Sequence, residues 1–290
     1  MASVAERRNV NVAGDVYVDS TCIDCDTCRW MAPSVFERVQ EQSSVHHQPA
    51  TPEELHRALM ALVACPTASI GTTEHHDLKP VLAAFPDPID GPVSHCGFHH
   101  EDSFGATSYF IARPGGNVLV DSPRFAGPLV KRLEELGGVA LLVLTHKDDV
   151  ADHAKFAQHF GCARVLHEQD VEADTRDVER VVVGREPVEL APDLVFIPTP
   201  GHTRGSACLL HDDKHLFTGD HLAWSERRGH VYGFRDACWY DWGELIASTR
   251  RLQHFRFEWI LPGHGRRCHF PLDEMGDQMR RCITWMESAR

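Results

Sequence analysis

Three cysteines near the start of the chain, Cys22, Cys25 and Cys28, are each separated by two residues. Thiolates at this spacing on one short loop bind three corners of a cubane iron–sulfur cluster, one iron each. The fourth corner needs a distant cysteine, and Cys65, after a helix predicted over 52–63, supplies it. The spacing therefore predicts one cluster held by these four residues.

Two alternatives compete with the cluster. Zinc also binds thiolates, but structural zinc sites usually combine paired Cys-x-x-Cys knuckles or histidines. Buried thiols without a ligand role would not show this spacing. The pattern therefore favours iron over both alternatives.

Histidines and aspartates form a second group, in four short motifs that each follow a predicted apolar strand. An imidazole or carboxylate in that place lies on a loop at one rim of a sheet. Several nitrogen and oxygen ligands that converge on one rim are what a divalent metal requires. The motifs are Thr145–His153, Thr199–Thr203, Thr218–His221 and Leu261–Gly265.

The elements that must position these residues are strands mixed with helices. We expect strands over 108–112, 118–121, 139–145, 163–166, 194–198, 207–211, 215–218 and 260–261, and helices over 128–137, 150–160 and 272–289. This mixture favours an α/β architecture over an all-β one. Because the stretch before it is rich in proline and irregular, we predict an iron–sulfur domain over 1–72, a linker over 73–93 and a second domain over 94–290.

Composition excludes several classes of protein. The 290 residues suffice for about two domains. No apolar run approaches the roughly 20 residues that span a bilayer, so we expect no membrane association. A net charge of −13 argues against a nucleic-acid binder. Since no apolar stretch follows the first arginines, we expect a cytoplasmic protein, or an organellar one if a transit segment was removed.

The segment over 15–72 resembles the single-cluster bacterial-type ferredoxins. The four cysteines match their pattern, with proline directly after Cys65, and so do the flanking segments Met31–Phe36 and Ala64–Ile70. The resemblance implies a small ferredoxin-like domain with a [4Fe-4S] cluster that carries one electron.

The segment over 94–270 resembles the metallo-β-lactamase fold through the order and spacing of the four motifs. The resemblance implies a four-layer αββα sandwich with a metal site at one edge. By this likeness His202 is a ligand of the first metal, Asp220 bridges two metals and His264 binds the second. The whole chain is then a two-domain protein of α+β and α/β character.

The first motif departs from the usual His-x-His-x-Asp-His pattern of that family. Asp148 replaces the second histidine, and the next two positions of the pattern hold Val150 and Ala151, which are unable to bind a metal. In one interpretation two residues are inserted, so that His146 and Asp148 bind one metal and Asp152 and His153 the other. In the other interpretation, Asp149 caps a helix and Asp152 is its partner in the first turn, which weakens or removes one metal position. The added carboxylate shifts the preference from zinc towards iron or manganese.

An aromatic segment, 236–242, follows the Asp220 motif, where this fold commonly builds its substrate wall. Cys238 within it is a candidate reactive thiol, and Arg204 is a candidate for binding an anionic group. The default for both the thiol and the aromatic rings is ordinary burial in a core.

We expect a metal-dependent hydrolase in which one or two divalent ions activate water against an ester, thioester or phosphodiester. Asp220 would bridge the metals, and Asp152 or Asp148 would orient the water. One alternative is an iron-dependent oxidoreductase whose cluster feeds electrons to a mono- or di-iron centre. Another is a non-catalytic electron-transfer or redox-sensing module. The expected partners are a small-molecule substrate and a redox partner protein.

Overall fold

The cysteine-rich segment is built around one capped helix. In the computed structural model, which describes residues 2–289, α2 (Pro52–Ala64) begins where Thr51 Oγ1 accepts a hydrogen bond from the Glu54 N–H at 3.2 Å. Proline at the first helical position and glutamates in the first turn suit the free N–H groups there. The helix confirms the expectation over 52–63 and ends directly before Cys65.

Short strands close this segment. β1 (Val16–Val18) pairs antiparallel with β4 (Ile70–Thr72), and β2 (Phe36–Val39) forms a hairpin with β3 (Gln42–Val45). α1 (Thr27–Met31) begins inside the cysteine loop. The three cysteines of the loop and Cys65 are thereby held within one small body.

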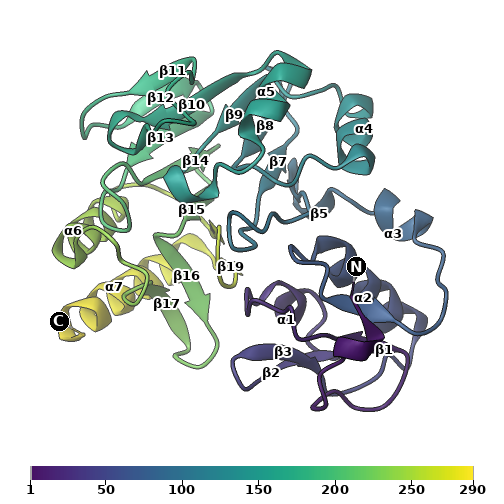
Figure 1. The fold of residues 1–290 in the computed structure, drawn as a ribbon. Helices are drawn as coiled ribbons and strands as arrows, with labels where there is room; N and C mark the ends of the chain where they lie inside the picture. Colours follow the sequence, from purple (N-terminus) through teal and green to yellow (C-terminus); the bar gives the residue numbers. More distant parts are fainter. Residues whose placement is uncertain (1, 290) are drawn as a thin grey trace. The chain divides into compact units, whose positions relative to one another are not determined.

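The described residues divide into two units (Figure 1), the first containing 2–117 and 123–139 and the second 118–122 and 140–289. The segment expected to be a linker, 73–93, carries α3 (Lys79–Ala83) and β5 (Asp87–Asp90) of the first unit. The predicted domain limits stay a prediction.

The rest of the first unit has three antiparallel strands and helices. β6 (Val93–His95) pairs with β5 on one side and with β7 (Tyr109–Ile111) on the other. α4 (Gly127–Glu135) packs against α3. Between β6 and β7 the chain forms turns that return to the cysteine loop, as described below.

The second unit contains strands from two sheets. Its parallel strands lie in the order β8 (Val118–Val120), β9 (Leu141–Val143), β10 (Ala163–His167) and β11 (Arg180–Val182). The other sheet is mixed and six-stranded, in the order β12 (Val188–Ala191), β13 (Leu194–Pro198), β14 (Ala207–His211), β15 (His215–Gly219), β18 (Trp259–Pro262) and β19 (Cys268–His269).

Helices and a hairpin cover these sheets. α5 (His153–Phe160) packs against β10, and α7 (Leu272–Ser288) packs against α6 (Trp242–Leu252) and the hairpin of β16 (Leu222–Ser225) and β17 (His230–Gly233). One apolar core joins α6 and α7 to the six-stranded sheet. The expected fold class is confirmed: an α/β sandwich follows a small cysteine-rich segment.

One expected helix begins later than predicted. The helix predicted over 150–160 starts at His153, because the 3₁₀ turn η2 (Lys147–Asp149) comes first and Ala151 adopts a positive φ of 27°. That backbone interrupts the helix and turns the residues on either side in different directions. Among the described residues, no helix combines the length and apolar character needed to cross a membrane.

Truncating the core beneath α6 and α7 will destabilise the second unit. Leu216 on β15 is fully buried in that core. We expect Leu216→Ala to cost about 2–5 kcal/mol in the free energy of unfolding, measured by urea denaturation. Val183→Ala is the control, because Val183 is 67% exposed. Equal effects of the two substitutions would contradict this description of the core.

Candidate functional site

The four histidine and aspartate motifs lie on loops that follow strands of the second unit. His146 comes three residues after β9 ends, and His202 comes four residues after β13 ends. Asp220 directly follows β15, and His264 follows β18 after one residue. The strand ends therefore bring residues far apart in the sequence to one place.

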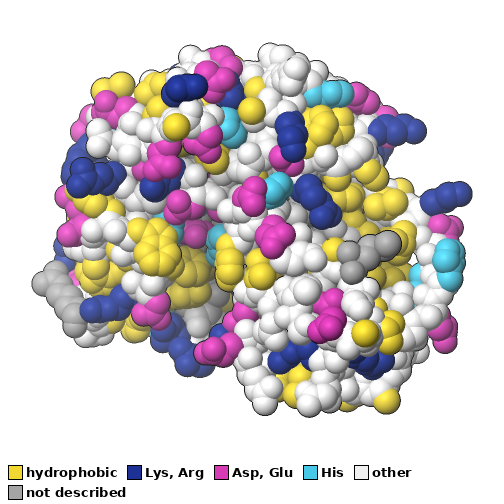
Figure 2. All heavy atoms as spheres, viewed as in Figure 1, with side chains coloured by type: hydrophobic (Ala, Val, Ile, Leu, Met, Phe, Trp, Pro, Cys, Tyr) yellow, Lys and Arg dark blue, Asp and Glu magenta, His cyan; other side chains and the backbone are white. Residues whose placement is uncertain are grey.

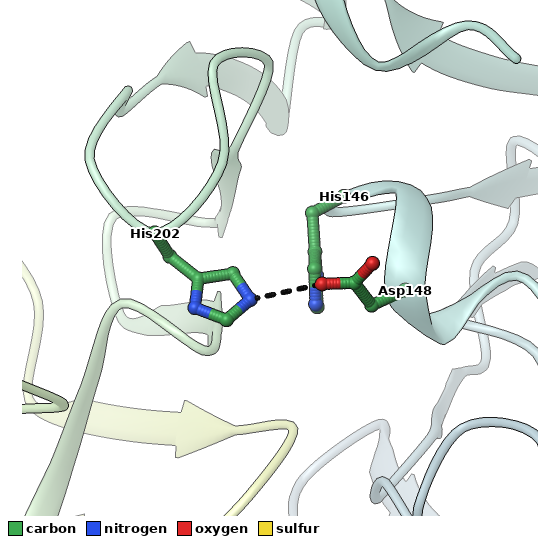
Figure 3. A group of neighbouring side chains, drawn as sticks. All are labelled: His146, Asp148 and His202. Atoms are coloured by element: carbon green, nitrogen blue, oxygen red, sulfur yellow. Dashed lines mark ion pairs between the residues drawn. The ribbon is translucent and has the colours of Figure 1, made fainter. Parts of the chain in front are cut away.

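Three side chains form a first group of close ligand atoms: His146, Asp148 and His202 (Figure 3). Their nitrogen and oxygen atoms lie within 4.8 Å of one another. His202 Nε2 is 3.3 Å from Asp148 Oδ2, and the rings of His146 and His202 stand nearly perpendicular with centroids 4.8 Å apart. Asp148 is the solvent-facing member, with 43% of its side chain exposed.

A second group shares His146 and adds Asp149 and Asp220. His146 Nε2 is 3.8 Å from Asp149 Oδ2. Asp220 lies 3.8 Å from His202 Nε2 and 2.8 Å from His264 Nδ1. Asp220 is therefore next to both groups, as a bridging carboxylate must be.

Buried ligand atoms in this site fit a cation. His146 Nε2, His202 Nε2 and Asp149 Oδ2 are buried, and none makes a hydrogen bond within residues 2–289. A buried polar atom without a partner costs roughly 1–3 kcal/mol. His202 Nε2 belongs to the first group and Asp149 Oδ2 to the second, with His146 in both, so a divalent metal in each group would satisfy these atoms.

Neighbouring groups fix how the imidazoles point. His202 Nδ1 donates to the Ala237 carbonyl at 2.6 Å, which leaves Nε2 for a metal. His146 Nδ1 is 3.0 Å from Thr145 Oγ1, and that hydroxyl donates to the buried carboxylate of Asp121 at 3.0 Å. The same bonding pattern, with the second ring nitrogen held by an oxygen, is typical of metal-binding histidines.

Asp170 joins the first two motif loops. Its carboxylate accepts the Lys147 N–H at 3.1 Å and the Gly205 N–H at 2.7 Å. The side chain is almost fully buried. Asp170 was not among the expected site residues, since nothing in its local sequence indicates a link over more than thirty positions to Gly205.

Glycine is required where two motif loops meet. A Cβ on Gly263 would lie 2.8 Å from Asp149 Oδ2 and 3.1 Å from Asp220 Oδ1. Gly219 has a φ of +47°, and a Cβ there would lie 2.4 Å from Thr145 Oγ1. Side chains at these positions would displace the groups that hold the site together.

Burial and charge set the proton affinities. Burial raises the pKa of Asp149 well above its ordinary value, and the charge of Asp220 adds to the rise. Burial raises the pKa of Asp121 to about 7 and lowers the pKa of His146 to about 4. Burial also acts to raise the pKa of Asp220, but His264 outweighs it and holds that pKa below its usual range. The buried carboxylates therefore face a histidine that favours its neutral form, and a cation would balance their negative charge.

The structure brings together most of the expected ligands but not all. His146, Asp148, His202, Asp220 and His264 converge. Asp152 instead pairs with Lys155 at 2.6 Å, and His153 Nδ1 lies 3.2 Å from the guanidinium of Arg164.

Asp149, which the helix-cap interpretation placed at a helix N-terminus, lies close to His146 and Asp220 in the second group. The helix-cap interpretation is not seen, because α5 has Asp152 at its N-cap position without a capping side-chain bond. In the sequence, the adjacent acidic pair at 148–149 was the one signal that Asp149 belongs to the site. The 3₁₀ turn η2 then shows that both carboxylates face it.

The four predicted cluster cysteines line one cavity in the first unit, together with apolar side chains such as Ile23 and Ile70. Backbone N–H groups point at two of the sulfurs: Ser43 at Cys22 over 3.4 Å and Ser69 at Cys65 over 3.3 Å. Four thiols around one space with N–H donors fit an iron–sulfur cluster. All ten cysteines are free, so no disulfide competes for these sulfurs.

Comparisons with known proteins agree with both centres. Residues 18–72 match the family described as the 4Fe-4S single cluster domain of Ferredoxin I, and residues 92–269 match the metallo-beta-lactamase superfamily. A probable metallo-hydrolase of Methanocaldococcus jannaschii is 26% identical over 207 residues, which cover 61% of this chain and 91% of that protein.

Two solved structures show the same fold in the second segment. The FIM-1 metallo-beta-lactamase from Pseudomonas aeruginosa, in its mono-zinc form, superposes with a TM-score of 0.52 at 15% identity, covering 68% of this chain and 93% of that one. The BLEG-1 B3 metallo-beta-lactamase gives a TM-score of 0.51 at 16% identity, covering 67% and 99%.

Two substitutions within one motif test which aspartate binds metal. We expect Asp149→Asn to lower the metal content of the second unit by about one ion per chain, because its buried oxygen faces His146 and Asp220. Asp152→Asn, the matched control, will keep the metal of the unsubstituted chain. Elemental mass spectrometry on both proteins measures this. The reverse pattern would restore the inserted-residue interpretation.

Proposed function

Since the chain belongs to the metallo-β-lactamase superfamily, we propose that its second unit is a metal-dependent hydrolase to which a [4Fe-4S] ferredoxin domain is fused. The observation that carries the proposal is the convergence of three histidines and three aspartates on loops from four strand ends. The metallo-hydrolase relative supports the same class of reaction.

The chain offers ligands for two neighbouring ions. His146, Asp148 and His202 would hold the first, Asp149 and His264 the second, and Asp220 would lie between them. A divalent ion there supplies Lewis acidity, lowering the pKa of water from 15.7 to near 7. We assign the orientation of that water to Asp148, the only one of these aspartates whose side chain opens widely to solvent, in place of Asp152.

The substrate would lie against an aromatic and basic surface beside His202. The ring of Trp239 is 6.2 Å from that of His202, and its side chain is 66% exposed. The Arg204 guanidinium lies over the Tyr240 ring at 5.1 Å. Figure 2 shows hydrophobic side chains beside acidic and histidine side chains over the region of α6 and β15. Such a surface suits an ester, thioester or phosphodiester with an apolar part and a negative charge.

Cys238 does not act as the nucleophile in this proposal. Its thiol donates to the Gly201 carbonyl at 3.1 Å, and burial raises its pKa above the ordinary value. A thiol that stays protonated is a weak nucleophile. The segment around it instead holds the His202 loop, because the Trp239 and Tyr240 N–H groups both donate to the His202 carbonyl.

One observation favours a second candidate, an iron-dependent oxidoreductase supplied by the cluster. Asp149 gives the site a third carboxylate, and oxygen donors shift metal preference from zinc towards iron or manganese. In that case the ferredoxin domain would deliver electrons to the second unit.

Hydrolysis assays on the anaerobically purified chain separate the two. The proposal predicts turnover of at least one aryl ester, thioester or bis-aryl phosphodiester, loss on chelation, and return with Zn²⁺ or Mn²⁺ alone. His202→Ala will lower kcat/KM by on the order of 10³-fold, whereas Asp152→Asn will not. Oxygen uptake that needs iron and a reduced cluster, without hydrolysis under any metal, would replace the hydrolase by the oxidoreductase.

A further inference from the structure

Residues beyond the ferredoxin-type segment complete the surroundings of the cluster cysteines. In the first unit, the turns between β6 and β7 place Gly105 against Cys25: a Cβ on Gly105 would lie 2.8 Å from Cys25 Cβ and 3.1 Å from its Sγ. Gly105 has a φ of +80°, which glycine adopts without strain. The His99 N–H donates to the Ala64 carbonyl at 3.2 Å, directly before Cys65.

A series of buried polar side chains leads away from Cys25. Cys25 Sγ is 3.4 Å from Thr27 Oγ1, and Thr27 Oγ1 is 3.2 Å from His99 Nδ1. His99 Nε2 is 2.8 Å from His95 Nε2. Thr27, His95 and His99 are each at least 97% buried. Trp30 and Phe85 pack their rings against His95.

The acceptors in this series fix the direction of its hydrogen bonds. The Gly105 carbonyl lies 2.6 Å from His99 Nδ1 and only accepts, so Nδ1 carries the proton. In a neutral imidazole Nε2 is then the acceptor, and His95 Nε2 donates to it. The ring Nδ1–H of His99 also faces Thr27 Oγ1. The Thr27 hydroxyl hydrogen therefore points away from His99.

Within residues 2–289, two acceptors remain for the Thr27 hydroxyl. The Gly105 carbonyl is 3.4 Å away and already accepts the shorter bond from His99. The other is Cys25 sulfur, which loses its proton when it binds iron and then only accepts. We propose that Thr27, held in place by His99, donates a hydrogen bond to Cys25 sulfur and thereby raises the reduction potential of the cluster.

The direction of the shift in reduction potential follows from the charge that the cluster gains. Reduction adds one electron to the cluster and its thiolates, and a donor to sulfur stabilises that added negative charge. The Thr27 proton stays on its oxygen throughout. His99 acts as a positioning residue: without it, the Gly105 carbonyl is free to take the Thr27 hydroxyl, and the bond to sulfur is lost.

Redox titration of the complete cluster-loaded chain, with dithionite as reductant and the electron paramagnetic resonance of the reduced cluster as the signal, tests this. We expect Thr27→Val to lower the equilibrium constant for reduction by about tenfold, which is about 59 mV for one electron. Thr27→Ser keeps the hydroxyl and will keep the potential. Thr72→Val is the matched control, because the Thr72 hydroxyl donates to the Glu74 carbonyl at 2.9 Å and Thr72 does not line the cavity of the four cysteines.

His99 has its own pair of variants. His99→Phe removes the donor and will shift the potential in the same direction as Thr27→Val, whereas His99→Asn offers an amide N–H near the place of Nδ1 and will restore much of it. Iron content per chain is measured on every variant. If Thr27→Val takes up no cluster, the difference in potential between His99→Phe and His99→Asn tests the proposal instead. Unchanged potentials in iron-replete Thr27→Val, or equal potentials of the two His99 variants, would overturn the proposal.

Discussion

Buried negative charge is the constraint on which the second unit depends. Asp149 and Asp220 lie in one group of close ligand atoms, Asp121 interacts with both through its charge, and burial disfavours ionisation of each. The groups facing Asp149 and Asp220 are imidazoles, of which His146 is itself driven towards the neutral form. A divalent cation removes this conflict, since it supplies two positive charges where the carboxylate oxygens meet. The loop glycines, the Thr145 hydroxyl and the Asp170 carboxylate are then the parts that keep those oxygens close.

In the first unit, too, buried negative charge needs partners, here at the four cysteine sulfurs. When cysteine sulfurs in an apolar cavity bind iron, they carry negative charge, which hydrogen-bond donors stabilise. Backbone N–H groups serve Cys22 and Cys65, and a side-chain hydroxyl is next to Cys25. In both units, therefore, short motifs supply the ligands, while distant segments supply the groups that orient them.

That division explains what the sequence could predict. The loop over 22–28, the Cys65-Pro66 pair and the motifs around His202, Asp220 and His264 are recognisable because each is a short local pattern. The position of Asp149 beside His146 and Asp220 was not recognisable, because it depends on a 3₁₀ turn and on the positive φ of Ala151, after which residues 152–153 make other contacts. The approach of His99 and Gly105 to the cysteine loop depends on contacts over more than seventy positions, for which the sequence offers no periodic signal.

Anomalous diffraction from crystals of the anaerobically purified chain, recorded at the iron and zinc edges, tests whether the two groups of side chains bind metal. We expect an iron signal among the four cysteine sulfurs and a separate metal signal whose ligands include Asp149 and Asp220. A metal bound by Asp152 and His153, or a second unit without metal in crystals that retain the cluster, would contradict this expectation.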